Sequence, residues 1–182
     1  MRNIIAMGMI MFVSACSAVS AADKPASTAF SAVLIQGNAK VFTAEEAKVG
    51  TVTLTQSGTG AVLTLKVAGL PAGTYGMHIH ETGKCEGPAY KSAGAHWNPG
   101  AKQHGLQNPA GTHNGDLANL VVTNGKVTRL RRQLAGLKLT GDGGLMDADG
   151  AAFIIHALPD DNKTDPSGNS GDRIICGVLR AI

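Results

Sequence analysis

The chain contains six histidines, and each stands where it could bind a metal ion. Imidazole nitrogen is a common metal ligand, and five of the six residues lie between positions 78 and 113. Scattered histidines usually include several surface residues with no function, but here none is evidently spare. The sequence therefore predicts a protein built around metal. The six are His78, His80, His96, His104, His113 and His156.

Two of the histidines are separated by a single residue, in the segment Met77-His78-Ile79-His80. On a β-strand, His78 and His80 project from the same face, while Met77 and Ile79 point to the other side. Each buried imidazole needs partners for its ring nitrogens, so such a pair is typical of a chelating site. His156 comes at the end of an apolar run and can complete a nitrogen-rich set with the pair, which favours copper by ligand type.

A second set of ligands falls in the segment 81–115 and just after it. His104, His113 and Asp116 supply two imidazoles and a carboxylate, and with His96 they form a four-ligand set that suits tetrahedral zinc. A zinc ion held by four protein ligands has no open position, so its role would be structural. It would order a segment that is rich in Gly, Pro, Ala and Asn and shows no hydrophobic periodicity.

The elements that must position these ligands are short β-strands. Only 4% of the 182 residues are aromatic and 24 are glycine, a composition typical of strands joined by glycine-bearing turns. The chain length suits one domain. Alternating hydrophobicity predicts an all-β antiparallel barrel or sandwich of about eight strands, with tight turns at 57–60 and 124–125. The predicted strands span residues 29–36, 50–56, 61–67, 74–80, 117–122, 126–130, 151–156 and 173–179.

The N-terminal residues resemble an export signal. Arg2 precedes an apolar run over residues 4–13, which is followed by small residues and is too short to span a bilayer permanently. Two cleavage sites remain open. Removal of residues 1–21 would leave a soluble domain of residues 22–182, whereas removal of residues 1–15 would leave a lipidated Cys16 that anchors the protein to a membrane. Both predict an exported protein of the periplasm or cell envelope.

Export also determines the expected state of the cysteines. In an oxidising compartment Cys85 and Cys176 should pair, which leaves Cys16 as the third. A closure this long stabilises by about 3–5 kcal/mol in the chain-entropy model. The net charge of +3 comes with no basic stripe or aromatic ladder, so nucleic acid is not an expected partner. A group of cations is interpreted as a solvated strand face: Lys126, Arg129, Arg131, Arg132 and Lys138.

From about residue 29 to the C-terminus, the chain resembles a bacterial-type copper/zinc superoxide dismutase. The motifs that carry the resemblance lie at residues 76–81, 94–99, 113–117 and 168–177. The spacing fits as well: His104 comes eight positions after His96, His113 nine positions after His104, and Asp116 three positions after His113. The resemblance implies an eight-stranded Greek-key barrel with two long functional loops.

The resemblance also implies a role for each of these residues. It makes His78, His80, His96 and His156 the copper ligands and His96, His104, His113 and Asp116 the zinc ligands, so that His96 bridges both metals. Cys85 and Cys176 match the family's disulfide. Arg173 matches its active-site arginine, and Asp160 matches the carboxylate that hydrogen-bonds imidazoles of both metal sets.

The implied activity is the disproportionation of superoxide to dioxygen and hydrogen peroxide. One copper ion per subunit would cycle between Cu(II) and Cu(I) beside one structural zinc ion. An alternative is an exported copper- and zinc-binding carrier on the same fold without catalysis. Family members include monomers and homodimers, and the sequence leaves both open.

Overall fold

The computed structural model describes residues 28–36, 47–124 and 127–182. The predicted signal segment, Cys16 and the second residue of the predicted 124–125 turn lie outside these ranges. Within them the structure contains no α-helix, and a short 3-10 turn, η1 (Lys91–Ala93), is the one helical element. No helix in the described part of the chain has the length and apolar character needed to cross a membrane.

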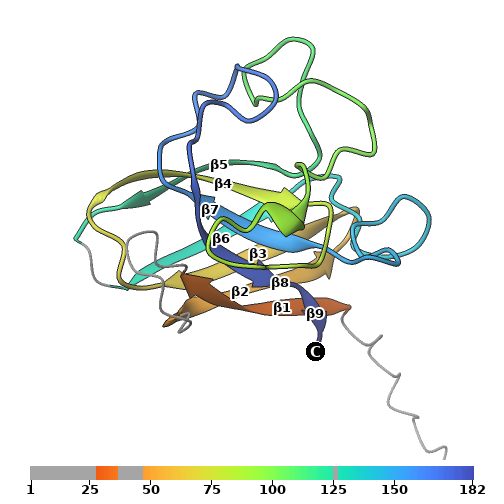
Figure 1. Ribbon diagram of the computed structural model, residues 1–182. Helices are drawn as coiled ribbons and strands as arrows, with labels where there is room; N and C mark the ends of the chain where they lie inside the picture. The colour runs from red at the N-terminus through yellow and green to blue at the C-terminus, as the bar shows by residue number, and fades with distance from the viewer. Residues whose placement is uncertain (1–27, 37–46, 125–126) are drawn as a thin grey trace, which may run out of the picture.

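Nine strands in the described ranges form one antiparallel sheet, ordered β5-β4-β7-β8-β1-β2-β3-β6, with β9 paired to β1. The sheet curls into a nearly closed barrel, in which β5 and β6 are the two free edges (Figure 1). The strands are β1 (Ala29–Gln36), β2 (Ala47–Ser57), β3 (Gly60–Val67), β4 (Gly73–His80), β5 (Asp116–Val122), β6 (Thr128–Leu134), β7 (Ala152–His156), β8 (Arg173–Val178) and β9 (Arg180–Ala181).

The strand order carries the Greek-key connection implied by the resemblance. β7 hydrogen-bonds to β4 and not to β6, which precedes it in the sequence. Because the two strands are antiparallel, His80 at the end of β4 lies opposite Ala152 at the start of β7, and His78 lies opposite Ile154. The His156 ring centroid is 4.8 Å from that of His78 and 5.9 Å from that of His80, so predicted ligands more than seventy residues apart in sequence meet on neighbouring strands.

Along β4, apolar side chains that point into the barrel alternate with histidines that point out of it. Met77 and Ile79 lie in the main hydrophobic core with no exposed surface. His78 and His80 are equally buried but project from the outer face of the strand, beneath the long loops. Figure 1 shows these loops, residues 81–115 and 157–172, rising from the side of the barrel that holds β4, β5 and β7.

The predicted strands are confirmed, with shifts at their ends. β6 starts at Thr128 and ends at Leu134, two and four residues later than expected, because the alternating pattern of exposure continues through the arginines to Leu134. The last predicted strand is β8, which ends at Val178, one residue earlier than expected; β9 follows it, was not predicted, and pairs with β1. The hairpin at 57–60 forms as predicted, with Ser57 opposite Gly60.

Candidate metal centre

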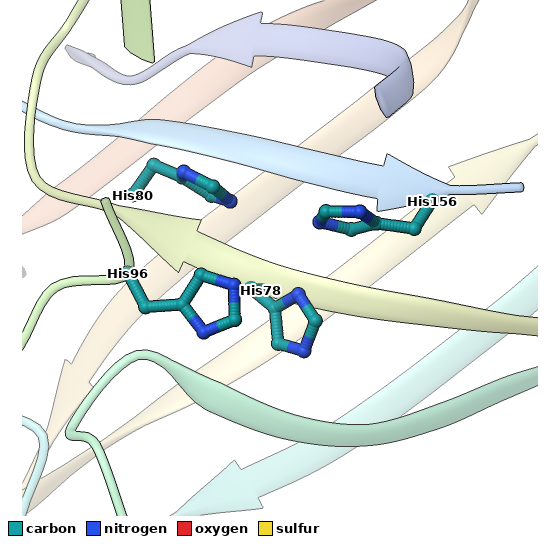
Figure 2. A group of neighbouring side chains, drawn as sticks. All are labelled: His78, His80, His96 and His156. Atoms are coloured by element: carbon teal, nitrogen blue, oxygen red, sulfur yellow. The ribbon is translucent and has the colours of Figure 1, made fainter. Parts of the chain in front are cut away.

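Four histidines from β4, β7 and segment 81–115 converge on the outer face of the β4–β7 ladder. His78 and His80 come from β4 and His156 is the last residue of β7, while His96 belongs to the long loop and forms a β-bridge with His80. Figure 2 shows the four rings facing a common space. One potential ligand atom from each residue lies within 4.8 Å of the others. The structure therefore brings together the whole set that the resemblance assigns to copper.

Hydrogen bonds orient three of these rings and leave one nitrogen of each available. His80 Nδ1 lies 3.0 Å from the Gly94 carbonyl oxygen, and His156 Nδ1 lies 3.1 Å from that of Gly171. His78 Nε2 lies 2.7 Å from Asp160 Oδ2. The remaining nitrogens, His78 Nδ1, His80 Nε2 and His156 Nε2, are buried without a hydrogen-bond partner in the described structure. Buried polar atoms without partners are costly, and a metal ion satisfies all three.

The electrostatic environment keeps these imidazoles neutral. Burial lowers the pKa of His80 well below its ordinary value and that of His156 to about 3. Burial also lowers the pKa of His96 to about 4, although the hydrogen bond to Asp116 opposes the shift. At neutral pH their lone pairs are therefore free to bind a metal ion without first losing a proton.

A second group of potential ligands adjoins the first and shares His96 with it. Ligand atoms of His78, His96, His104 and Asp116 also lie within 4.8 Å of one another. His113, the fourth member of the predicted zinc set, lies at its edge, with Nδ1 3.3 Å from Asp116 Oδ1 and 3.5 Å from His96 Nδ1. The four residues predicted for zinc thus meet around Asp116 Oδ1.

Segment 81–115 fixes the Asp116 carboxylate through its second oxygen. Asp116 Oδ2 accepts hydrogen bonds from the backbone N–H groups of Gly105 and His113 and from the Thr112 hydroxyl, at 2.8–3.0 Å. Oδ1 is left facing His96 and His104. Burial raises the pKa of Asp116, but these hydrogen bonds outweigh it and hold the pKa far below its ordinary value. The Asp116 carboxylate is therefore ionised at any physiological pH, as binding a metal ion would require.

His104 lies between two carboxylates in the structure without metal. Its Nδ1 is 2.9 Å from Asp116 Oδ1 and its Nε2 is 3.0 Å from Asp160 Oδ1. Burial alone would lower the pKa of His104, but the two hydrogen bonds outweigh it and raise the pKa to about 9. At neutral pH His104 therefore carries a proton on both nitrogens, and a metal ion held by this ring would displace one.

Zinc binding to the metal-free protein should consequently release about one proton below pH 9, and the apparent affinity should rise about tenfold per pH unit up to that value. Isothermal titration calorimetry at pH 7.5 in buffers with different protonation enthalpies would count the proton. His104→Gln removes the titrating group, so its residual zinc binding should release none. Zinc binding to the native protein without proton release would contradict the assignment.

Asp160 links the two groups. One carboxylate oxygen contacts His78 and the other contacts His104, and Asn119 clamps the backbone of Asp160 through two hydrogen bonds of 2.9 Å. Gly168 adopts φ +62, and a Cβ there would collide with the Asp160 carboxylate and His104. A glycine is therefore required for this carboxylate to reach both rings.

Arg173 stands at the start of β8 beside His156, its partner in the β7–β8 ladder. Its half-buried guanidinium donates hydrogen bonds of 2.8 Å to the carbonyl oxygens of Tyr90 and Gly94. The Gly94 oxygen also accepts from His80, so one peptide group orients both side chains.

The predicted Cys85–Cys176 disulfide is present and joins the start of segment 81–115 to β8.

Several residues that build the site had no distinct signal in the sequence. The Tyr90, Gly94 and Gly171 carbonyls act through the backbone, which any residue type could provide. Segment 81–115 was expected to depend on metal and disulfide for its order, but β4 also holds it directly. Trp97 N–H donates to the Ile79 carbonyl oxygen at 2.9 Å, and Ile79 N–H donates to that of Gly115 at 2.8 Å.

Comparison with known proteins places these features in a family. A family model described as copper/zinc superoxide dismutase matches residues 48–179. The chain is 38% identical to Cu-Zn superoxide dismutase 2 of Aquifex aeolicus over 80% of this chain and 87% of that protein. It is 43% identical to the Cu-Zn superoxide dismutase of Caulobacter vibrioides, over 72% and 78%. A crystal structure of a double mutant of a superoxide dismutase-like protein from Bacillus subtilis superposes with a TM-score of 0.75 at 38% identity, covering 82% of this chain and 95% of that one.

Proposed function

The chain belongs to the copper/zinc superoxide dismutase family, and we propose that it disproportionates superoxide to dioxygen and hydrogen peroxide with one copper and one zinc ion per subunit. The observation that carries the proposal is the trio of buried, unpartnered nitrogens on His78, His80 and His156, each on a ring whose other nitrogen is already hydrogen-bonded. One metal ion bound by all three nitrogens would provide each with a partner. Superoxide-removal assays of the protein loaded with both metals test the activity directly.

The proposed ligand sets follow from the two groups. His78, His80, His96 and His156 would hold copper, and His96, His104, His113 and Asp116 would hold zinc. Copper supplies the one-electron oxidation and reduction that disproportionation requires, while zinc is redox-inert. His96 Nδ1 faces Asp116 at 3.0 Å, so Nε2 is the nitrogen on the copper side, where it can hold a proton for the product peroxide.

The remaining site residues position these ligands and attract the substrate. Asp160 accepts hydrogen bonds from His78 and His104 and so fixes the tautomer of each ring. Arg173 keeps its positive charge at all physiological pH values, although burial lowers its pKa. Anchored by two carbonyl oxygens, the guanidinium presents a fixed cation beside His156 and His80 that can attract superoxide and hydrogen-bond it.

Arg173→Ala should lower kcat/KM for superoxide by roughly tenfold or more, because it removes the fixed cation without removing a ligand. Copper and zinc contents should match those of the unmodified protein. Arg173→Lys keeps the charge and should recover part of the rate, but a lysine cannot span both carbonyl oxygens. Stopped-flow kinetics with metal analysis would measure both effects. An unchanged kcat/KM in the alanine variant would remove Arg173 from the mechanism.

A carrier without catalysis is the alternative, and the B. subtilis relative is itself named only as superoxide dismutase-like. Metal transport alone requires neither a residue shared by the two metals nor a fixed arginine beside them. In this chain His96 occurs in both groups, and two carbonyl oxygens fix the Arg173 guanidinium. These features favour the enzyme. Full loading with copper and zinc but no removal of superoxide would favour the carrier.

We also propose that the protein is exported to the periplasm or cell envelope. Support comes from the sequence of residues 1–21 and from the Cys85–Cys176 disulfide, since such bonds persist in oxidising compartments. The mature protein should begin either at Ala22 or at a lipidated Cys16. Intact-mass spectrometry of protein from its native host distinguishes the two, and a chain that retains Met1 would contradict export.

A further inference from the structure

The outer face of the sheet formed by β9, β1, β2, β3 and β6 is basic. Lys66 on β3 and Arg129 and Arg131 on β6 are exposed and alternate with inward-facing residues such as Leu65. Arg180 on β9 is exposed too and pairs with Ser31 of β1. These four cations, together with the hydroxyl residues between them, are called the basic face below.

Strand register arranges the basic face in two rows. In the first row Thr51, Lys66 and Arg129 lie side by side across β2, β3 and β6. The second row crosses all five strands and runs Arg180, Ser31, Thr53, Thr64, Arg131. With strands about 4.8 Å apart, this second row is roughly 19 Å long. Cations thus stand at both ends of an array of hydroxyl groups.

The strands that form this face carry no carboxylates within their described bounds. None of the five strands contains an Asp or Glu. Among the described residues, none of the four cations forms a salt bridge, since every ion pair there involves a histidine of the metal centre or its surroundings. Lys66 also lies directly opposite Arg129. Like charges in that position destabilise a sheet, and the interpretation as a merely solvated face does not account for the pairing.

We propose that the basic face docks the protein onto an anionic lipid bilayer. Phosphate groups at a membrane surface are closely spaced hydrogen-bond acceptors that carry negative charge. The arginines, the lysine and the hydroxyl groups of the basic face are donors that can bind several of them at once. They would also offset the repulsion between Lys66 and Arg129. An array about 19 Å long fits a surface that bears many phosphates better than it fits one small anion.

The position of the basic face in the molecule suits this partner. β1 and β2 lie on the side of the barrel away from the long loops that carry the metal ligands (Figure 1). A protein docked through this face therefore keeps its metal centre directed toward the solvent. The face includes β1, which begins at Ala29, thirteen residues after Cys16 (29 − 16). A basic patch would add to the hold of a lipid anchor at Cys16, and it would act alone if the mature chain begins at Ala22.

Co-sedimentation of the metal-loaded mature protein with vesicles tests the proposal. We expect binding to vesicles of phosphatidylcholine with phosphatidylglycerol, no binding to phosphatidylcholine alone, and release as salt screens the charges. The triple variant Lys66→Gln, Arg129→Gln, Arg131→Gln should lower the partition coefficient roughly 100-fold, since each cation contributes about 1 kcal/mol near an anionic surface.

A matched control removes the same number of charges from the loops. The residues Lys84, Lys91 and Lys102 are exposed and lie outside the basic face, and replacing all three by glutamine should leave vesicle binding within about twofold. Retained removal of superoxide by the basic-face variant would show that it is folded. Equal losses in both triple variants, no vesicle binding by the native protein, or binding to soluble polyphosphate but not to vesicles would each overturn the proposal. None of these outcomes bears on the proposed enzymatic activity.

Discussion

His96→Ala should reduce the removal of superoxide about 100-fold or more and weaken the binding of both metals. His96 is one of two residues that occur in both ligand groups, and the other, His78, has its Nε2 engaged by Asp160 at 2.7 Å. Loss of His96 would therefore remove a proposed ligand from each set, and with it the nitrogen proposed to hold the proton for peroxide. Proton transfer by a positioned side chain contributes on the order of 10²–10⁴ in rate.

Single-set variants provide the comparison for His96→Ala. His156→Ala should lower copper affinity and leave zinc affinity within about twofold, because His156 lies only in the first group. His113→Ala should do the opposite, since its Nδ1 approaches Asp116 and His96 on the zinc side. Competition titrations with chromophoric chelators would measure each metal separately. If His96→Ala left zinc affinity unchanged, His96 would not be the bridge.

Loss of the disulfide should produce the largest effect on stability. The variant Cys85→Ser, Cys176→Ser should lower the free energy of unfolding of the metal-free protein by about 3–5 kcal/mol, because the bond closes a loop with a sequence separation of 91 residues. Denaturant unfolding monitored by circular dichroism would measure it. The native protein treated with a reductant provides the matched control and should unfold at the same midpoint. A difference below about 1 kcal/mol would show that the rest of the fold already holds the loop.

The same variant should also lower the rate of the folded enzyme. Cys85 lies at the start of the loop whose Tyr90 and Gly94 carbonyls hold Arg173 and His80. If the loop relaxes without the disulfide, Arg173 loses its fixed position. The loss in kcat/KM should then be no greater than that of Arg173→Ala, because both act on the same cation. A larger loss at full metal content would indicate a second role for the disulfide.

Much of this protein could be predicted from local sequence patterns. Leu63, Leu65 and Val67 alternate with polar residues and form a strand that begins one residue before the expected start and ends where expected, since a two-residue period is a property of the backbone itself. His78 and His80 share a face for the same reason. The end of β6 was misjudged because three arginines among its seven residues obscured the alternation that carries the strand to Leu134.

The sequence by itself determined the ligand types, their spacing and the all-β class, because side-chain chemistry and strand alternation are local. Only the tertiary structure decided which groups meet. Pairing of β7 with β4 puts His156 beside His78 and His80, and the fold sets one carboxylate, Asp160, between His78 and His104. Strand register likewise places arginines and a lysine from different strands side by side on one basic face. These contacts join residues far apart in the chain, and long-range pairing leaves no periodic trace in a single sequence.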